Sequence, residues 1–264
     1  EMFMRQVIQL VLIGFLLLTT GCVTLYKPNT VYSPLLKEKG ELNTSASLGI
    51  SGGGLYNLQA AYAITDHIGL IGDGMYHSRI AKTNNSTDSG YEKLNIFFGE
   101  AGAGYFSKFG GEKNGLIQCY GGSGLGRTSD RIFNTTTPNP EVNAKYFNVF
   151  IQPGVAYTSK YVELAFDMRA NYVQLYKIHS YLYSKFEFWN TDFHYYSDTT
   201  LNFVNLEPVI TIKVGGDKLK GVVQFGATIP SIHPKSYFAV NNSALLLVPL
   251  LKFSIGISYT IGKE

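Results

Sequence analysis

The sequence predicts an all-β protein, a ten-stranded antiparallel transmembrane β-barrel formed by residues 42–264. Three observations support this fold class. Many segments alternate apolar and polar residues with a period of two, which places the two kinds of side chain on opposite faces of a strand. Short turns between these segments alternate with long polar connections. The chain also opens with an apolar run typical of exported proteins.

The clearest strand is predicted for residues 162–172. Every second residue from Val162 to Tyr172 is apolar or aromatic, whereas the positions between them include Glu163, Asp167 and Arg169. The same pattern recurs along the chain, as expected for strands with lipid on one side and a polar barrel interior on the other. The alternative is a soluble β-sandwich, which would have to bury these apolar stripes against a second sheet.

Composition agrees with this fold class. Charged residues make up 16% of the chain, compared with roughly 25% in ordinary soluble domains, and there are 28 Gly, 19 Tyr and 17 Phe. After residue 21 no stretch approaches the ~18 apolar residues of a membrane-spanning helix. The net charge of +3 comes without a Lys/Arg cluster, which argues against nucleic acid as a partner.

The N-terminus reads as an export signal over residues 1–21, because Arg5 precedes an apolar run that ends in small residues before Cys22. The residues LLLTTGC resemble a bacterial lipobox, which implies cleavage before Cys22 and lipidation of its thiol. Thr19 departs from that pattern, since the usual Leu lies one place earlier. The alternative is an ordinary signal peptide with an incidental cysteine. After lipidation, Cys119 would be the only free thiol, which excludes an intrachain disulfide.

Residues 22–41 are expected to be a lipidated, extended tether. Pro28 and Pro34 break regular structure, and the charges of residues 37–41 make the segment too polar to cross a bilayer. We therefore expect the tether to lie outside the barrel, on the periplasmic side.

The first five strands are expected at 42–51, 55–64, 68–77, 94–106 and 117–128. Glycines at 52–54, the polar residues 65–67 and the stretch 109–114 supply tight turns between them. The sequence AYAITDHIGL (61–70) resembles a strand–turn–strand motif that is common in small bacterial outer-membrane barrels. Alternating apolar residues that define these strands include Leu48 and Ile50, Leu58 and Tyr62, Ile68 and Leu70, Phe97 and Tyr105, and Cys119 and Leu125.

The last five strands are expected at 147–157, 162–172, 204–214, 219–227 and 251–261. Residues 159–160 and the Gly-Gly-Asp stretch 215–217 make their short turns, the latter well suited to positive φ. Polar, aperiodic residues 80–93, 129–145 and 180–198 are expected to be long outer loops. Short periplasmic turns and long outer loops are typical of outer-membrane barrels. Ten strands that start from a periplasmic tether place both termini in the periplasm of a Gram-negative bacterium.

The interior is expected to hold eleven long polar side chains. Five are acidic, five are basic and one is His: Asp73, His77, Glu100, Arg127, Glu163, Asp167, Arg169, Glu207, Lys213, Lys220 and Lys252. A ten-stranded barrel is only slightly wider than one that side chains just fill, so we expect interlocking ion pairs and no open channel. The alternative is a narrow pore or ligand-uptake barrel.

The sequence offers few candidates for catalysis, and we expect neither an enzyme nor a metal or other cofactor. Asp192-Phe193-His194 resembles the Asp-x-His of the omptin proteases, which are also ten-stranded outer-membrane barrels; the resemblance would imply a surface hydrolase. The facing loop offers only Asp88 and Glu92, without the family's Asp pair. Asp73 with His77 could form a metal or catalytic site, but lumen histidines more often belong to structural pairs. No phosphate loop or nucleophile elbow occurs.

The aromatic stretch 180–198 is the strongest functional signal. Aromatic side chains give large contact areas at low entropic cost, so this stretch could contact an outer-membrane protein partner. The alternative is a strand extension with an aromatic girdle or self-packing. The candidate contacts are Tyr181, Tyr183, Phe186, Phe188, Trp189, Phe193, Tyr195 and Tyr196. The sequence thus predicts a lipidated barrel, in contact with outer-membrane lipid, that serves as a structural or accessory subunit of an outer-membrane assembly.

Overall fold

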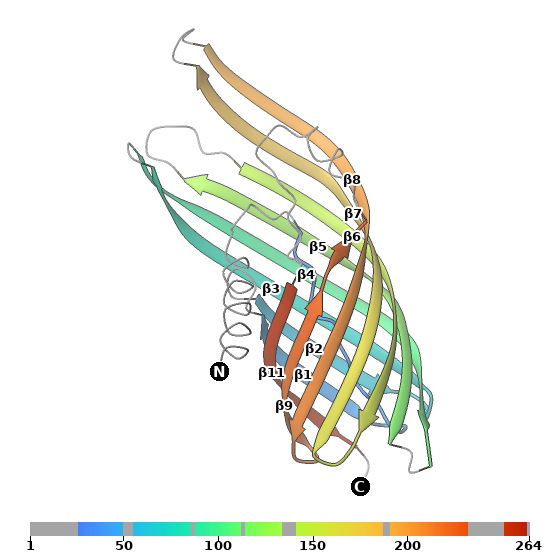
Figure 1. Ribbon diagram of the computed structural model, residues 1–264. Coiled ribbons are helices and arrows are strands. Elements are labelled where there is room, and N and C mark those ends of the chain that lie inside the picture. The colour runs from blue at the N-terminus through green and yellow to red at the C-terminus, as the bar shows by residue number, and fades with distance from the viewer. Residues whose placement is uncertain are drawn as a thin grey trace, which may run out of the picture.

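The computed structural model describes residues 26–49, 55–85, 88–111, 114–133, 141–186, 191–231 and 251–262, which form a closed antiparallel barrel (Figure 1). Six long strands make up one side of the wall, and four short strands with one two-residue strand make up the other. The strands are β1 (Leu42–Gly49), β2 (Leu55–Ala63), β3 (Ile68–Asn85), β4 (Asp88–Phe109), β5 (Gly115–Phe133), β6 (Glu141–Thr158), β7 (Val162–Phe186), β8 (Thr191–Gly215), β9 (Leu219–Ala227), β10 (Ile229–Pro230) and β11 (Leu251–Ile261).

Ten of these strands close the ring. Each strand from β1 to β8 pairs with the next, β8 pairs with β9, β9 with β11, and β11 with β1. The two-residue β10 pairs with β8 beyond the end of β9. The predicted fold class, a ten-stranded antiparallel barrel, is therefore confirmed. Within the described residues no helix is long and apolar enough to cross a membrane.

Strands β3 to β8 continue well past the predicted ends. They are 18–25 residues long, whereas β1, β2, β9 and β11 have 8–11 residues. Most residues of the three expected outer loops are strand, because β3 and β4 pair up to Asn85 and Asp88, and β7 and β8 up to Phe186 and Thr191. The expectation of loops is thus wrong there. A sheet beyond the bilayer can be polar on both faces, so it lacks the hydrophobic period on which the prediction relied.

The long strands bend where they leave the closed part of the barrel. The β6–β7 pairing shifts register at Asn143/Lys145, and the β7–β8 pairing shifts between Leu175 and Ile178, where Lys177 has a φ of 51°. Such bulges increase the local twist and bend a sheet. They separate the ring from the projecting β7–β8 hairpin (Figure 1).

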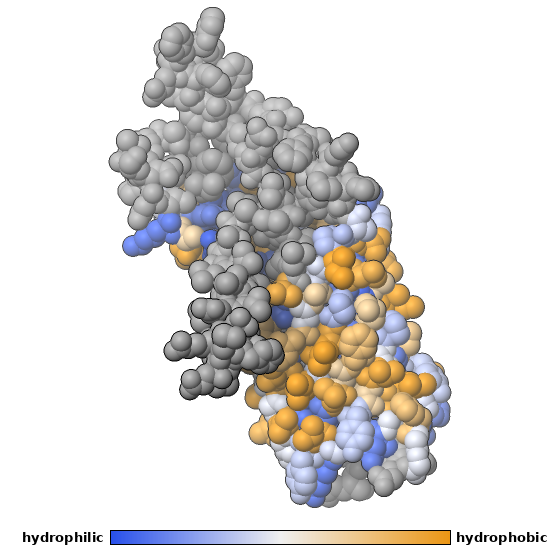
Figure 2. Space-filling view, viewed as in Figure 1, coloured by the Kyte–Doolittle hydropathy of each residue, from blue (hydrophilic) through white to orange (hydrophobic). Residues whose placement is uncertain are grey.

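Apolar side chains gather on the outer face of the closed part of the barrel that Figure 2 shows. On β7 the side chains of Val162, Leu164, Phe166 and Tyr172 are exposed, whereas the acidic and basic residues between them are buried. From 162 to 172 the strand rises about 33 Å, which a tilt near 40° projects to about 25 Å, the height of the apolar band of outer-membrane barrels. The predicted alternation of faces is confirmed on this strand.

One predicted lumen residue lies on the outer face. Arg127 occupies an exposed position on β5, and its guanidinium lies 6.0 Å from the ring centre of exposed Phe97 on β4. Residues of odd number on this stretch of β5 face outward, so Arg127 shares its face with Leu125. Across the sheet it continues a row of outward aromatic residues, Tyr56, Tyr76 and Phe97. An arginine beside aromatic residues suits the edge of an apolar band.

Candidate functional site: the filled lumen

The main feature of the barrel is the peptide segment inside it. All residues from Tyr26 to Leu36 are buried, although none of them belongs to a strand. We expected this part of the chain to be a tether outside the barrel, and the structure instead places it in the lumen. The reason is that its apolar side chains are buried there, while wall side chains satisfy its polar main chain. We call residues 26–36 the lumen segment.

The lumen segment runs along the barrel axis. At the end with the short turns, Gly40 N donates to Ala63 O (2.8 Å) and Lys39 N donates to Asp66 Oδ1 (3.0 Å). At its other end, Lys27 Nζ lies 3.0 Å from His77 Nε2, and His77 pairs with the first residue of β2. The segment therefore spans the closed part of the barrel. We call its two ends the turn end and the hairpin end.

Five consecutive main-chain carbonyls of the lumen segment accept hydrogen bonds from wall side chains. The donors come from five different strands, β11, β2, β9, β6 and β8. The bonds are Lys252 Nζ to Asn29 O (3.1 Å), Gln59 Nε2 to Thr30 O (3.0 Å), Gln224 Nε2 to Val31 O (2.8 Å), Gln152 Nε2 to Tyr32 O (2.8 Å) and Lys213 Nζ to Ser33 O (2.7 Å). Buried carbonyls need such partners, so the wall is built to hold an extended peptide.

Side chains of the same segment and of the turn after it donate hydrogen bonds to wall carboxylates. Asn29 donates to Asp73, and Ser33 donates to Asp167. Nearer the turn end, Lys37 Nζ lies 2.7 Å from Glu163 Oε1, which Lys220 Nζ also approaches at 3.3 Å. Three of the predicted lumen carboxylates are thus satisfied partly by residues that the sequence placed outside the barrel.

Two further ion pairs link wall strands directly. Arg169 donates from Nη1 to Glu100 Oε1 (2.7 Å) and from Nη2 to Glu100 Oε2 (2.5 Å), and its guanidinium stacks 4.0 Å from the ring centre of Phe150. Lys252 Nζ donates to Glu207 Oε2 at 2.9 Å. The Arg169 and Glu100 side chains are only 2% and 3% exposed, so each charge depends on the other for its compensation.

Apolar clusters close both ends of the lumen. Near the turn end, Leu35 and Leu36 of the lumen segment pack with Phe106, Leu116 and Tyr120 of the wall. Wall and segment are matched closely here: a Cβ on Gly69 would lie 2.7 Å from Leu36 Cδ1. The lumen segment thus completes an apolar core at this end.

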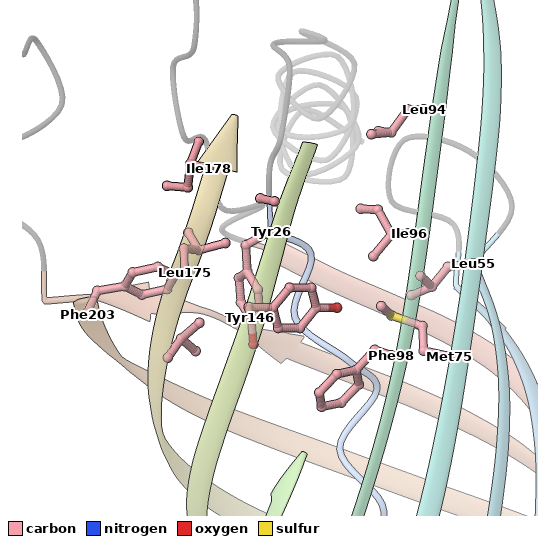
Figure 3. Close-up of a cluster of buried hydrophobic side chains, with 12 residues drawn as sticks. Tyr26, Leu55, Met75, Leu94, Ile96, Phe98, Tyr146, Leu175, Ile178 and Phe203 are labelled. Atoms are coloured by element: carbon pink, nitrogen blue, oxygen red, sulfur yellow. The ribbon is translucent and has the colours of Figure 1, made fainter. Parts of the chain in front are cut away.

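A second cluster lies near the hairpin end. The ring of Tyr26 meets Tyr146 edge to face at 5.3 Å and Phe203 at 5.5 Å, and Tyr146 stacks on Phe98 (Figure 3). Tyr26 OH also accepts from Asn171 Nδ2 at 3.0 Å. The first described residue of the chain is therefore fixed inside the wall.

The structure places ten of the eleven predicted lumen residues on the inner face, with Arg127 the exception. It brings His77 to Lys27 and Asp73 to Asn29 and Gln59, not to each other. Among the described residues no group of His, Cys, Asp or Glu could hold a metal ion. The lumen segment was not predicted from the sequence. The one available signal was its five apolar or aromatic residues, unusual for a solvated tether: Tyr26, Val31, Tyr32, Leu35 and Leu36.

The other candidate sites lie on the projecting hairpins. Asp192 and His194 belong to β8, opposite Lys185 and Tyr183 of β7, whereas Asp88 and Glu92 belong to β4; β5 and β6 separate the two hairpins in the sheet. Tyr181, Tyr183 and Phe186 are on β7, and Phe193, Tyr195 and Tyr196 are on β8. Phe188, Trp189 and Cys22 lie outside the described residues.

Comparison with known proteins gives little beyond the fold. No family model matches the chain, and no curated protein matches it significantly. Among solved structures, the barrel is similar to a major outer membrane protein from Thermus thermophilus, with a TM-score of 0.39 and 11% sequence identity. That likeness covers 84% of this chain and 99% of the other.

Proposed function

We propose that this protein is a closed outer-membrane barrel that acts as a non-enzymatic structural or accessory subunit at the surface of a Gram-negative cell. The filled lumen is the observation that carries this proposal. A peptide segment held at five consecutive carbonyls occupies the space through which a solute would have to pass. The apolar outer face supports insertion in a bilayer. Exposing Leu58, Phe166 and Ile257 to water would cost free energy, whereas exposing them to lipid does not.

The proposal orients the barrel with its turn end in the periplasm. The connections at residues 64–67, 110–114, 159–161 and 216–218 are short, and the opposite end carries the long hairpins. This is the usual arrangement of outer-membrane barrels. The C-terminal strand β11 ends at Ile261 at the turn end, so this orientation would put the C-terminus in the periplasm.

We further propose that Cys22 is lipidated and that the aromatic β7–β8 hairpin contacts a protein partner. The hairpin projects beyond the ring (Figure 1), at the end that the proposed orientation turns toward the cell exterior. Removing residues 182–196 would shorten it and leave the ring pairing of β7 and β8 in place. A pull-down in gentle detergent, analysed by mass spectrometry, should recover partners with the full protein and lose them with this deletion. Equal recovery with both proteins would contradict the partner role.

Conductance in planar bilayers tests the proposal as a whole. The purified protein should insert and give no steady single-channel current, whereas a variant lacking residues 26–36 should conduct, because the remaining lumen is lined by polar and charged side chains. Current from the deletion variant also serves as the control for insertion. A large, reproducible conductance of the unaltered protein would contradict the closed barrel and favour a pore.

A further inference from the structure

The two ends of the described chain lie at opposite ends of the barrel. Ile261 pairs with Leu42 at the turn end, close to Gly40 and the 64–67 turn. Tyr26 packs near the hairpin end, beside Tyr146 and Phe203. Between them the lumen segment crosses the barrel in one direction. Asn29 O accepts from Lys252, near the start of β11 at the hairpin end, and Ser33 O accepts from Lys213, near the end of β8 at the turn end.

We propose that the chain enters the lumen from the hairpin end, so that the residues before Tyr26 emerge at the cell surface while the C-terminus stays in the periplasm. This inference rests on the proposed function for the orientation of the barrel in the outer membrane. It replaces the expectation that both termini are periplasmic. That expectation assumed a tether outside the barrel, and residues 26–36 are inside it.

The filled lumen leaves no return path for the preceding residues. From His77, which contacts Lys27, to Ile68 at the turn end, the nine residue steps of β3 cover about 30 Å, or about 23 Å along the axis. The cavity beside Lys27, Pro28 and Lys252 measures about 20 Å³, which holds about one water molecule. This cavity is too small for a second extended peptide, and the lumen segment is buried along its whole length.

The same geometry assigns the lipid anchor to one leaflet. Only four residue steps separate Tyr26 from Cys22, which an extended chain spans in at most about 14 Å. That is less than the ~23 Å that would bring Cys22 to the turn end. The diacylglyceryl group proposed for Cys22 therefore inserts in the outer leaflet beside the barrel. The protein then presents its N-terminal residues, with the lipid anchor, on the cell surface.

Single-cysteine labelling on intact cells tests this inference. Thr24→Cys, Asp217→Cys and Trp189→Cys would be introduced separately into a Cys119→Ser parent that keeps Cys22. Labelling of each variant by a membrane-impermeant maleimide would be compared with that of the parent, before and after permeabilisation of the outer membrane. We expect Thr24→Cys to label equally in both conditions. Trp189→Cys in the β7–β8 connection should behave in the same way, and Asp217→Cys in a short turn should label only after permeabilisation.

The outcomes separate the inference from the proposed function. Labelling of Thr24→Cys only after permeabilisation, together with surface labelling of Trp189→Cys, would overturn the surface N-terminus and leave the barrel's orientation intact. Surface labelling of Asp217→Cys but not of Trp189→Cys would overturn both, because the barrel would then be inverted. A small thiol substitution is preferred over an epitope tag, since a tag next to Tyr26 could disturb the aromatic cluster at the hairpin end.

Discussion

Two stretches of eleven residues differ in what forms hydrogen bonds with their main-chain groups. In Val162–Tyr172 the neighbouring strands β6 and β8 pair with the main chain, and the side chains only divide between lipid and lumen. In Tyr26–Leu36 no strand pairs with the chain, and its carbonyls depend on side chains of five different strands. The wall is thus held by generic main-chain pairing, and the lumen segment by specific side chains.

The comparison also explains the mixed charges of the interior. The lumen of a ten-stranded barrel has room beyond what wall side chains fill, and the lumen segment fills it. Wall carboxylates such as Asp73 and Asp167 have partners on the segment, and wall donors such as Lys213 and Gln152 meet its carbonyls. The polar inner face is therefore a binding surface for one peptide as well as a set of ion pairs.

Breaking the buried ion pair of the wall should have the largest effect. Arg169→Met removes both hydrogen bonds to Glu100 and leaves a buried carboxylate uncompensated, which typically costs about 3–5 kcal/mol. Denaturant unfolding in detergent or vesicles measures this loss. The double variant Arg169→Met/Glu100→Gln should recover part of the stability. If the double variant is as unstable as Arg169→Met, the unpaired Glu100 carboxylate is not the cause of the lost stability.

A charge on the outer face should cost slightly less. Phe166→Arg places a guanidinium near the middle of the apolar band of β7, for which about 2–4 kcal/mol is expected in a bilayer. The same unfolding measurement in lipid vesicles reports it. Tyr161→Arg in the exposed 159–161 turn is the matched control and should cost at most the contact of its ring with Lys160, about 0.5–1 kcal/mol. Equal stability of Phe166→Arg and the control would show that this face does not contact hydrocarbon.

Removing one wall donor tests how the lumen segment is held. Gln152→Met keeps the side-chain length but removes the 2.8 Å donor to Tyr32 O together with a 3.4 Å bond to Asp167, which should cost about 1–3 kcal/mol. Gln174→Met is the control, because Gln174 is a partly exposed residue of β7. Equilibrium unfolding of the two variants should differ clearly. Identical midpoints would mean that the carbonyl contact contributes nothing.

Replacing the outward arginine should have the smallest effect. Arg127→Leu loses a 6.0 Å contact with the Phe97 ring, and such contacts at exposed sites contribute about 0.5–1 kcal/mol. A loss above about 3 kcal/mol in the unfolding assay would indicate a buried partner and return Arg127 to the interior.

The strands of the wall could be predicted from the sequence because their apolar and polar side chains alternate with a period of two. Alternation placed Phe166 outside and Asp167 inside, and short turns such as 215–217 set the strand order. Arg127 was predicted to face the lumen because it is charged. Its odd number on β5, however, puts it on the same outward face as Leu125. The hairpin extensions 80–85, 88–93 and 129–133 are mostly polar in sequence, so they show no hydrophobic period.

The lumen segment could not be predicted in the same way. Its partners are single side chains far apart in the sequence, such as Lys213 and Lys252, and nothing local to residues 26–36 indicates them. Proline and mixed charge also describe a solvated tether. A lumen segment differs from a solvated tether in that Tyr26, Tyr32 and Leu36 contact apolar residues of the wall. Only the closed ring brings those wall residues together.

A disulfide across the lumen tests most directly whether the lumen segment fills the barrel. Ser33 Oγ lies 3.2 Å from Thr211 Oγ1 of β8, 178 residues away along the chain. In a background with Cys22 and Cys119 replaced by Ser, the pair Ser33→Cys/Thr211→Cys should form a disulfide on oxidation. The unfolded protein should then migrate faster until reductant is added, whereas Ser33→Cys/Thr65→Cys should not cross-link. Absence of the first cross-link in the folded barrel would contradict a lumen filled by its own N-terminal segment.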